Sequence, residues 1–87
     1  MAEVRLPRHL ADLFPGTPRR LDIEASTVRE ALDALDVRVP GMGDRLLAAG
    51  PVIREHLRVF VDGEQANLGT TLRPGSVVQV IMAVSGG

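Results

Sequence analysis

The sequence contains neither cysteine nor lysine. Without cysteine, the chain can form no disulfide and offers no thiolate as a metal ligand or nucleophile. All ten of its basic residues are arginine, so no side chain carries the primary amine that Schiff-base chemistry requires. The side chains therefore supply neither a sulfur nor an amine nucleophile.

A large charge excess and long apolar runs are also missing. Ten arginines against eleven carboxylates give a net charge of −1, which does not suggest a nucleic-acid binder or a polybasic membrane anchor. The longest apolar run, residues 80–84, is far below the roughly 20 residues of a membrane-spanning helix. Residues 1–5 lack the pattern of a secretory signal. We therefore expect a cytoplasmic location, with no nucleic acid and no membrane as partner.

The composition is typical of one small globular domain. Of the 87 residues, 45% are hydrophobic and 24% charged, which favours a folded chain over a disordered one. A core can form at this size, but a deep enclosed active site would be hard to build. Four segments alternate apolar and polar residues and predict strands over residues 4–6, 20–25, 56–62 and 77–83.

The segment that follows the second predicted strand has helical periodicity. Thr27 and Glu30 form a capping box, in which the Thr27 hydroxyl accepts from the Glu30 N–H and the Glu30 carboxylate accepts from the Thr27 N–H. The apolar residues behind it share one helical face: Val28, Ala31, Leu32 and Leu35. This pattern predicts an amphipathic helix that ends near Asp36.

Shorter pieces connect these elements. We expect a helical turn over residues 9–14, a short helix over 44–49 and a brief strand within 68–72. Turn residues stand at 15–18, 62–63 and 73–76. The order of elements is strand, strand, helix, strand, short piece, strand. It predicts an α+β domain, with a four- or five-stranded mixed sheet packed on one main helix.

This order of elements resembles the ubiquitin-like β-grasp fold. Residues 74–78 (Pro-Gly-Ser-Val-Val) and 83–87 (Ala-Val-Ser-Gly-Gly) resemble the last strand and end of the bacterial sulfur carriers. That family includes the small subunit of molybdopterin synthase, the thiamine-pathway carrier and carriers that serve cysteine synthesis. Residues 59–64 (Val-Phe-Val-Asp-Gly-Glu) resemble its third strand and turn. The segment 40–55 is longer than in thiamine carriers, which favours the molybdopterin and cysteine types.

The resemblance implies a β-grasp domain over residues 1–83 and a flexible tail over 84–87. Gly87, preceded by Gly86, would be adenylated and converted to a thiocarboxylate that donates sulfur in cofactor or amino-acid biosynthesis. The chain would be a carrier and not an enzyme, and it would bind no cofactor itself. ATP and magnesium would be used by an adenylating enzyme of the ubiquitin-activating type. The other implied partners are a sulfurtransferase or sulfur donor and a sulfur-accepting enzyme.

Other interpretations of the same ending stay open. The chain could act as the small, sulfur-donating subunit of molybdopterin synthase, with Gly86-Gly87 inserted into a larger catalytic subunit. It could instead be a ubiquitin-like modifier that is conjugated through Gly87 to lysines of other proteins. A plain interaction module with no terminal chemistry is the third alternative.

The resemblance also implies docking through the outer face of the sheet. By alternation, Phe60 points away from the core side of its strand. In the last strand, Val78, Val80 and Met82 are expected to face the helix. The predicted docking residues are Arg5, Pro7, Arg58, Phe60, Gln79, Ile81, Val84 and Ser85. A bulge in a strand, or a segment 40–55 folded over the face, would remove this surface.

The remaining polar residues predict no chemistry. His9 and His56 are far apart in sequence and have no third ligand at useful spacing, so we expect surface histidines. Ser76 and Ser85 lack a base partner in any known motif. Arg19-Arg20 is interpreted as the exposed start of a strand.

Overall fold

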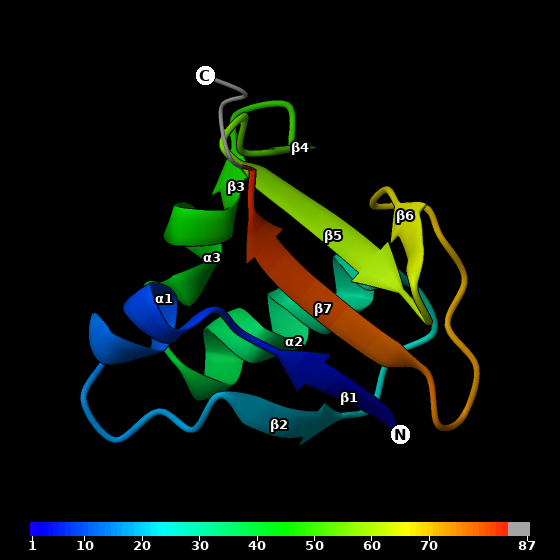
Figure 1. Ribbon diagram of the computed structural model, residues 1–87, viewed down its shortest axis with the longest axis horizontal. Helices are drawn as coiled ribbons and strands as arrows, with labels where there is room; N and C mark the ends of the chain where they lie inside the picture. The colour runs from blue at the N-terminus through cyan, green and yellow to red at the C-terminus, as the bar shows by residue number, and fades with distance from the viewer. Residues whose placement is uncertain (84–87) are drawn as a thin grey trace.

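The computed structural model describes residues 1–83; the predicted tail residues Val84, Ser85, Gly86 and Gly87 lie outside the described residues. Five strands form one mixed sheet in the order β2-β1-β7-β5-β6 (Figure 1). Neighbouring strands are antiparallel except for the central pair β1 and β7, which is parallel. The strands are β1 (Ala2–Arg5), β2 (Arg20–Ile23), β5 (Leu57–Val61), β6 (Glu64–Ala66) and β7 (Val77–Met82). The predicted mixed sheet is confirmed.

The main helix, α2 (Val28–Arg38), packs across one face of this sheet. The Thr27 hydroxyl accepts from the Glu30 N–H at 3.2 Å, as the capping box predicts. The Glu30 carboxylate, however, accepts from the N–H of Ser26 at 3.1 Å and not from that of Thr27. The helix extends two residues beyond the predicted end, because the Val39 N–H still reaches the Leu35 carbonyl at 2.8 Å.

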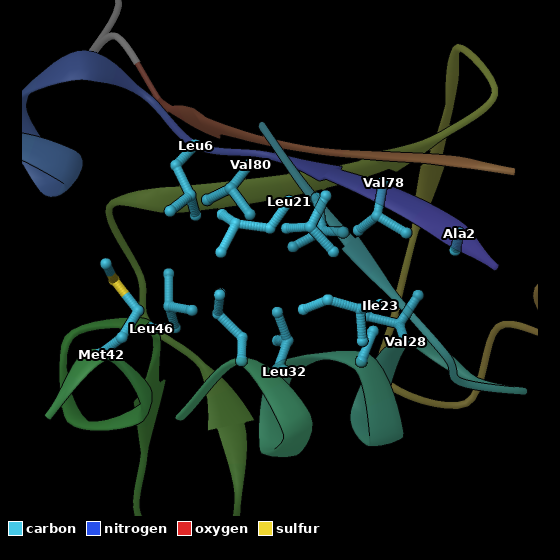
Figure 2. Close-up of a cluster of buried hydrophobic side chains, with 14 of the residues drawn as sticks. Ala2, Leu6, Leu21, Ile23, Val28, Leu32, Met42, Leu46, Val78 and Val80 are labelled. Atoms are coloured by element: carbon cyan, nitrogen blue, oxygen red, sulfur yellow. The ribbon is translucent and has the colours of Figure 1, made fainter. Parts of the chain in front are cut away.

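The core lies between α2 and the sheet (Figure 2). The predicted helical face of α2 is fully buried there, and so are most of the inward residues of the strands; Ala25 and Val61 are only partly buried and Met82 is exposed. Burying each large aliphatic side chain contributes about 1.5–3 kcal/mol relative to exposure. The largest of these buried side chains are Leu32, Leu35, Met42, Leu46, Leu57, Val4, Val28, Val59, Val78 and Val80.

The segment between α2 and β5 differs from the prediction. A short helix, α3 (Met42–Leu46), begins two residues before the predicted helix and ends three residues before its end. Gly41 has a φ of +97°, a left-handed conformation that suits glycine and lets the helix start at once. A small antiparallel hairpin, β3 (Leu47–Ala48) with β4 (Val52–Ile53), then follows and was not predicted.

The two other short pieces also differ. The predicted turn of helix is α1 (Arg8–Asp12), which ends two residues early. The brief strand predicted within 68–72 is wrong: β6 lies at 64–66, and Thr71 makes only an isolated bridge to Thr27. The reason is the tight turn at Asp62 and Gly63, whose φ values of +50° and +87° reverse the chain within two residues. The long strands agree with prediction to within two residues at each end.

Candidate functional site

α2 covers one face of the sheet and leaves the other face open. Five side chains form a row across the open face, one from each strand: Arg20, Arg5, Gln79, Phe60 and Gln65. The register pairs Arg5 with Arg20 on one side and with Gln79 on the other. It also pairs Phe60 with Gln79 and with Gln65. The pairing of β5 with β7 runs over five consecutive residue pairs without a bulge. The side-chain parity predicted for Phe60 is therefore the one in the structure.

A second pair on the same face lies one step nearer the end of β7. Ile81 is opposite Arg58 in the register. The Arg58 guanidinium donates to the carbonyls of Glu55 and Leu57, both at 2.8 Å, so it folds back over the start of its own strand. Phe60 and Ile81 are both half-buried. The open face thus presents two apolar side chains among polar and cationic ones.

Four of the predicted docking residues line one open hollow of about 820 Å³: Arg5, Pro7, Gln79 and Ile81. Arg58 and Phe60 share the face but do not line this hollow. Three further arginines line it that the sequence did not single out as functional: Arg8, Arg19 and Arg20. The signal that the sequence offers is the adjacent pair Arg19-Arg20, which by its pattern alone indicates only the exposed start of a strand.

The segment 40–55 does not cover the open face. Met42 and Leu46 of α3 are fully buried in the core, on the same side of the sheet as α2 (Figure 2). The alternative in which this segment folds over the predicted docking surface is therefore not what the structure shows.

Met82 departs from its expected position. Alternation places it on the core side of β7, but 45% of its surface is exposed. It lines a second open hollow of about 770 Å³ between α1 and α3, together with Leu13, which is 49% exposed. The prediction that Met82 packs on the main helix is wrong, because the end of β7 borders an open hollow.

The same second hollow brings together two residues that are distant in sequence. His9 and His56 both line it, and both are exposed. Within residues 1–83, no group of three or more histidine, aspartate or glutamate side chains is arranged to hold a metal ion. Ser76 is buried, and its hydroxyl accepts from the Arg73 N–H at 2.9 Å. Ser76 therefore stabilises the turn before β7.

The described chain ends beside these hollows. The Ala83 N–H donates to the His56 carbonyl at 2.8 Å, which extends the pairing of β7 with the start of β5. Gly87 stands four positions further along the sequence. None of the helices formed by residues 1–83 is long and apolar enough to cross a membrane.

Comparison with known proteins gives matches along nearly the whole chain. A family model described as the ThiS family matches residues 7–87. Small archaeal modifier protein 1 of Haloferax volcanii is 31% identical over 86 residues, which cover 98% of this chain and 99% of that protein. The crystal structure of the same archaeal protein matches with a TM-score of 0.76, 31% identity and coverage of 99% and 98% of the two chains.

A chain in the crystal structure of the Amycolatopsis orientalis BexX/CysO complex matches with a TM-score of 0.88. It is 23% identical to this chain, and the match covers 100% of each chain. At this identity, the likeness to the Amycolatopsis chain concerns the fold alone. With the archaeal structure, it confirms the expected ubiquitin-like β-grasp fold.

Proposed function

Because the chain belongs to the ThiS family, we propose that it is a sulfur carrier whose Gly87 carboxylate is adenylated and then converted to a thiocarboxylate. The observation that supports this most is the extent of the family match, which runs over residues 7–87 and so includes Gly86-Gly87. The chain acts as a substrate of other enzymes and not as a catalyst.

The chemistry uses the backbone carboxylate and no side chain. A Gly87 carboxylate oxygen attacks the α-phosphorus of ATP, and pyrophosphate leaves. A sulfide equivalent from a sulfur donor then adds to the carbonyl carbon, and AMP leaves with the electrons of the carbon–oxygen bond. The product keeps one oxygen and gains one sulfur. The adenylating enzyme binds the ATP and magnesium. A chain without cysteine suits this route, because the sulfur is held on the backbone.

Glycine at both terminal positions suits a slot in a partner enzyme. Glycine has no Cβ, so the backbone can pass through a narrow channel and adopt conformations closed to other residues. Ordering such residues costs about 1–2 kcal/mol each, which contacts elsewhere must offset. The open face of the sheet supplies those contacts in this proposal.

Mass spectrometry tests the terminal chemistry. After incubation with an adenylating enzyme of this class, ATP, magnesium and a sulfide source, we expect a mass gain of one sulfur-for-oxygen exchange. Deletion of Gly87 should abolish the gain while the fold, followed by circular dichroism, stays intact. Gly69→Ala, a glycine change in the turn after β6, serves as the control and should behave as wild type. Sulfur incorporation into the deletion variant would contradict the proposal.

The docking face is tested separately. Arg58→Glu and Phe60→Asp should each slow adenylation without unfolding the chain, because both residues lie on the open face. Arg29→Glu is the control, since Arg29 is exposed on α2 and its guanidinium contacts Asp33 at 3.1 Å. Unchanged kinetics in both test variants would remove the open face from the proposal.

A second candidate function is protein modification through Gly87. It is favoured by the 31% identical relative, which is named a modifier protein. In that case, peptides from target proteins should carry a Gly-Gly remnant on lysine. The chain itself has no lysine, so it could not form lysine-linked chains of its own copies. A stable complex with a molybdopterin synthase large subunit would instead indicate the subunit role.

A further inference from the structure

Arginines gather at the end of the molecule where β7 ends. The two hollows described above meet at His9 and Met82, which line both of them. Six of the ten arginines line these hollows, but only one of the eleven carboxylates, that of Asp44. We call this surface the basic pole, and its arginines are Arg5, Arg8, Arg19, Arg20, Arg45 and Arg54.

The positive charge of the basic pole is poorly compensated from within the described chain. Arg5 pairs with Glu3, and Arg8 approaches Asp12 at 3.8 Å. Among residues 1–83, the other four arginines form no ion pair. Two of those four donate to backbone carbonyls, Arg19 to Leu6 at 3.4 Å and Arg54 to Asp44 at 2.7 Å. A backbone carbonyl carries no net charge, so these bonds orient the guanidinium groups without neutralising them.

Of the carboxylate side chains in residues 1–83, only Asp44 lines the pole, and Glu3 and Asp12 reach two of its arginines from outside the hollows. Five others lie away from it: Glu30, Asp33 and Asp36 on α2, Asp62 in the turn between β5 and β6, and Glu64 at the start of β6. A net charge of −1 therefore conceals two regions of opposite sign. A chain of this kind is weakly repelled by an anionic surface in most orientations and attracted when the basic pole faces that surface.

The centre of the basic pole is apolar. Leu13 and Met82 are about half exposed in the second hollow, and the half-buried Ile81 lines the first hollow, on the other face of β7. An apolar centre with a charged rim is the usual anatomy of a protein–protein interface. Single-stranded nucleic acid, by contrast, requires exposed aromatic rings for stacking. The one aromatic at the pole, Phe14, is half-buried against Gly41.

We propose that the basic pole docks an acidic protein surface and thereby turns the end of β7 toward the partner. The identification of that partner as the adenylating enzyme rests on the proposed function. The docking itself rests on the placement of the six arginines around Met82. Charge complementarity of this kind acts mainly on the association rate and falls with added salt.

The first experiment uses the purified chain alone. In a titration with a hexaglutamate peptide at low ionic strength, followed by NMR, the amide shifts should concentrate around His9, Arg20, Arg45 and Met82 and should reverse with added salt. Shifts scattered over α2 and β6, or no shifts, would overturn the proposal. Tighter binding of a single-stranded DNA oligonucleotide of equal charge would assign the pole to nucleic acid instead.

The second experiment compares two double variants with the same change in net charge. Arg19→Glu with Arg20→Glu alters the basic pole, whereas Arg29→Glu with Arg73→Glu alters residues outside it. At low ionic strength, the association rate with the adenylating enzyme should fall on the order of tenfold for the first variant and change little for the second. The difference should vanish at high salt, and thermal melting checks that both variants fold.

Equal slowing in the two variants would show a net-charge effect and overturn the proposal. If the wild-type chain is not adenylated by such an enzyme, the proposed function fails. The peptide titration then still decides whether the basic pole binds an acidic protein segment.

Discussion

At the residue scale, Asp36 connects α2 with the beginning of α3. Its Oδ1 accepts from the Gly43 N–H at 2.7 Å and from the Gly41 N–H at 3.2 Å. These donors stand at the start of a helix, where backbone N–H groups have no partner within the helix. The carboxylate therefore determines how α3 leaves α2, and the close approach depends on a glycine at position 43.

Gly43→Ala should test this contact. A Cβ at position 43 would lie 2.9 Å from Cγ and Oδ1 of Asp36, which is too close for an undisturbed structure. We expect a loss of roughly 1–3 kcal/mol in the free energy of unfolding, measured with urea, as for other overpacked sites. In Gly69→Ala, the nearest atom would be Asn67 Oδ1 at 3.4 Å, so this control should lose much less.

Asp62 supports a second prediction at this scale. It has a left-handed φ of +50°, and its carboxylate accepts from the Val77 N–H at 2.9 Å. Asp62→Ala removes that acceptor and places an alanine in a conformation that aspartate and asparagine tolerate better. We expect a loss of about 1–2 kcal/mol in unfolding free energy. Asp62→Asn should retain most of the stability, and an equal loss in both variants would contradict this account.

At the scale of elements, the Thr27 side chain caps the N-terminus of α2, where the N–H groups of Val28 and Arg29 donate to backbone carbonyls. Thr27→Ala removes the hydroxyl that accepts from the Glu30 N–H. We expect thermal unfolding to report a loss of about 0.5–2 kcal/mol, the usual range for a lost N-cap. Thr27→Ser keeps the hydroxyl and should lie close to wild type. A serine variant as unstable as the alanine variant would show that the threonine methyl group, not the cap, is what matters.

The opposite end of α2 protects an edge strand. The Arg38 guanidinium donates to the Asp22 carbonyl of β2 at 2.6 Å. β2 lies at the edge of the sheet, where unpaired backbone groups can recruit another chain. The last residue of the helix thus occupies a backbone acceptor on one of the two edge strands of the sheet.

How far the sequence predicted these elements depended on their length. α2 and the four long strands were predicted because each repeats an apolar pattern over several residues. The β3–β4 hairpin has only two residues in each strand, too few for any period to show. The start of α3 depends on a contact from Asp36, seven positions before Gly43, and no local pattern indicates such a contact.

The candidate site was likewise predictable only where a local pattern determines the position of a residue. Strand parity placed Phe60, Gln79 and Arg5 on one face correctly, because alternation is a local property. The gathering of Arg20 with Arg45 and Arg54 was not predictable, since it requires β2, α3 and the segment before β5 to meet around the end of β7. The exposure of Met82 was missed for a related reason: burial at a strand end depends on what the tertiary structure places over it.

At the scale of the whole molecule, the segment between α2 and β5 belongs to the single core. Leu46→Ala in α3 should therefore destabilise the chain as Leu35→Ala in α2 does, by about 2–5 kcal/mol, since both side chains are fully buried. Val37→Ala is the control, because Val37 is 80% exposed. Chemical denaturation should show one cooperative transition in every variant, and a separate early transition in Leu46→Ala would mean that α3 unfolds independently.

The central pair of the sheet has a consequence for biosynthesis. β7, the last described strand along the chain, lies between β1 and β5 and is parallel to β1, the first. Without β7, the pairs β2–β1 and β5–β6 have no strand to join them into one sheet. Contacts so distant in sequence form late and slowly. The sheet is therefore completed only when β7 pairs with both β1 and β5, so no complete five-stranded sheet exists during synthesis until residues 77–82 are free to pair.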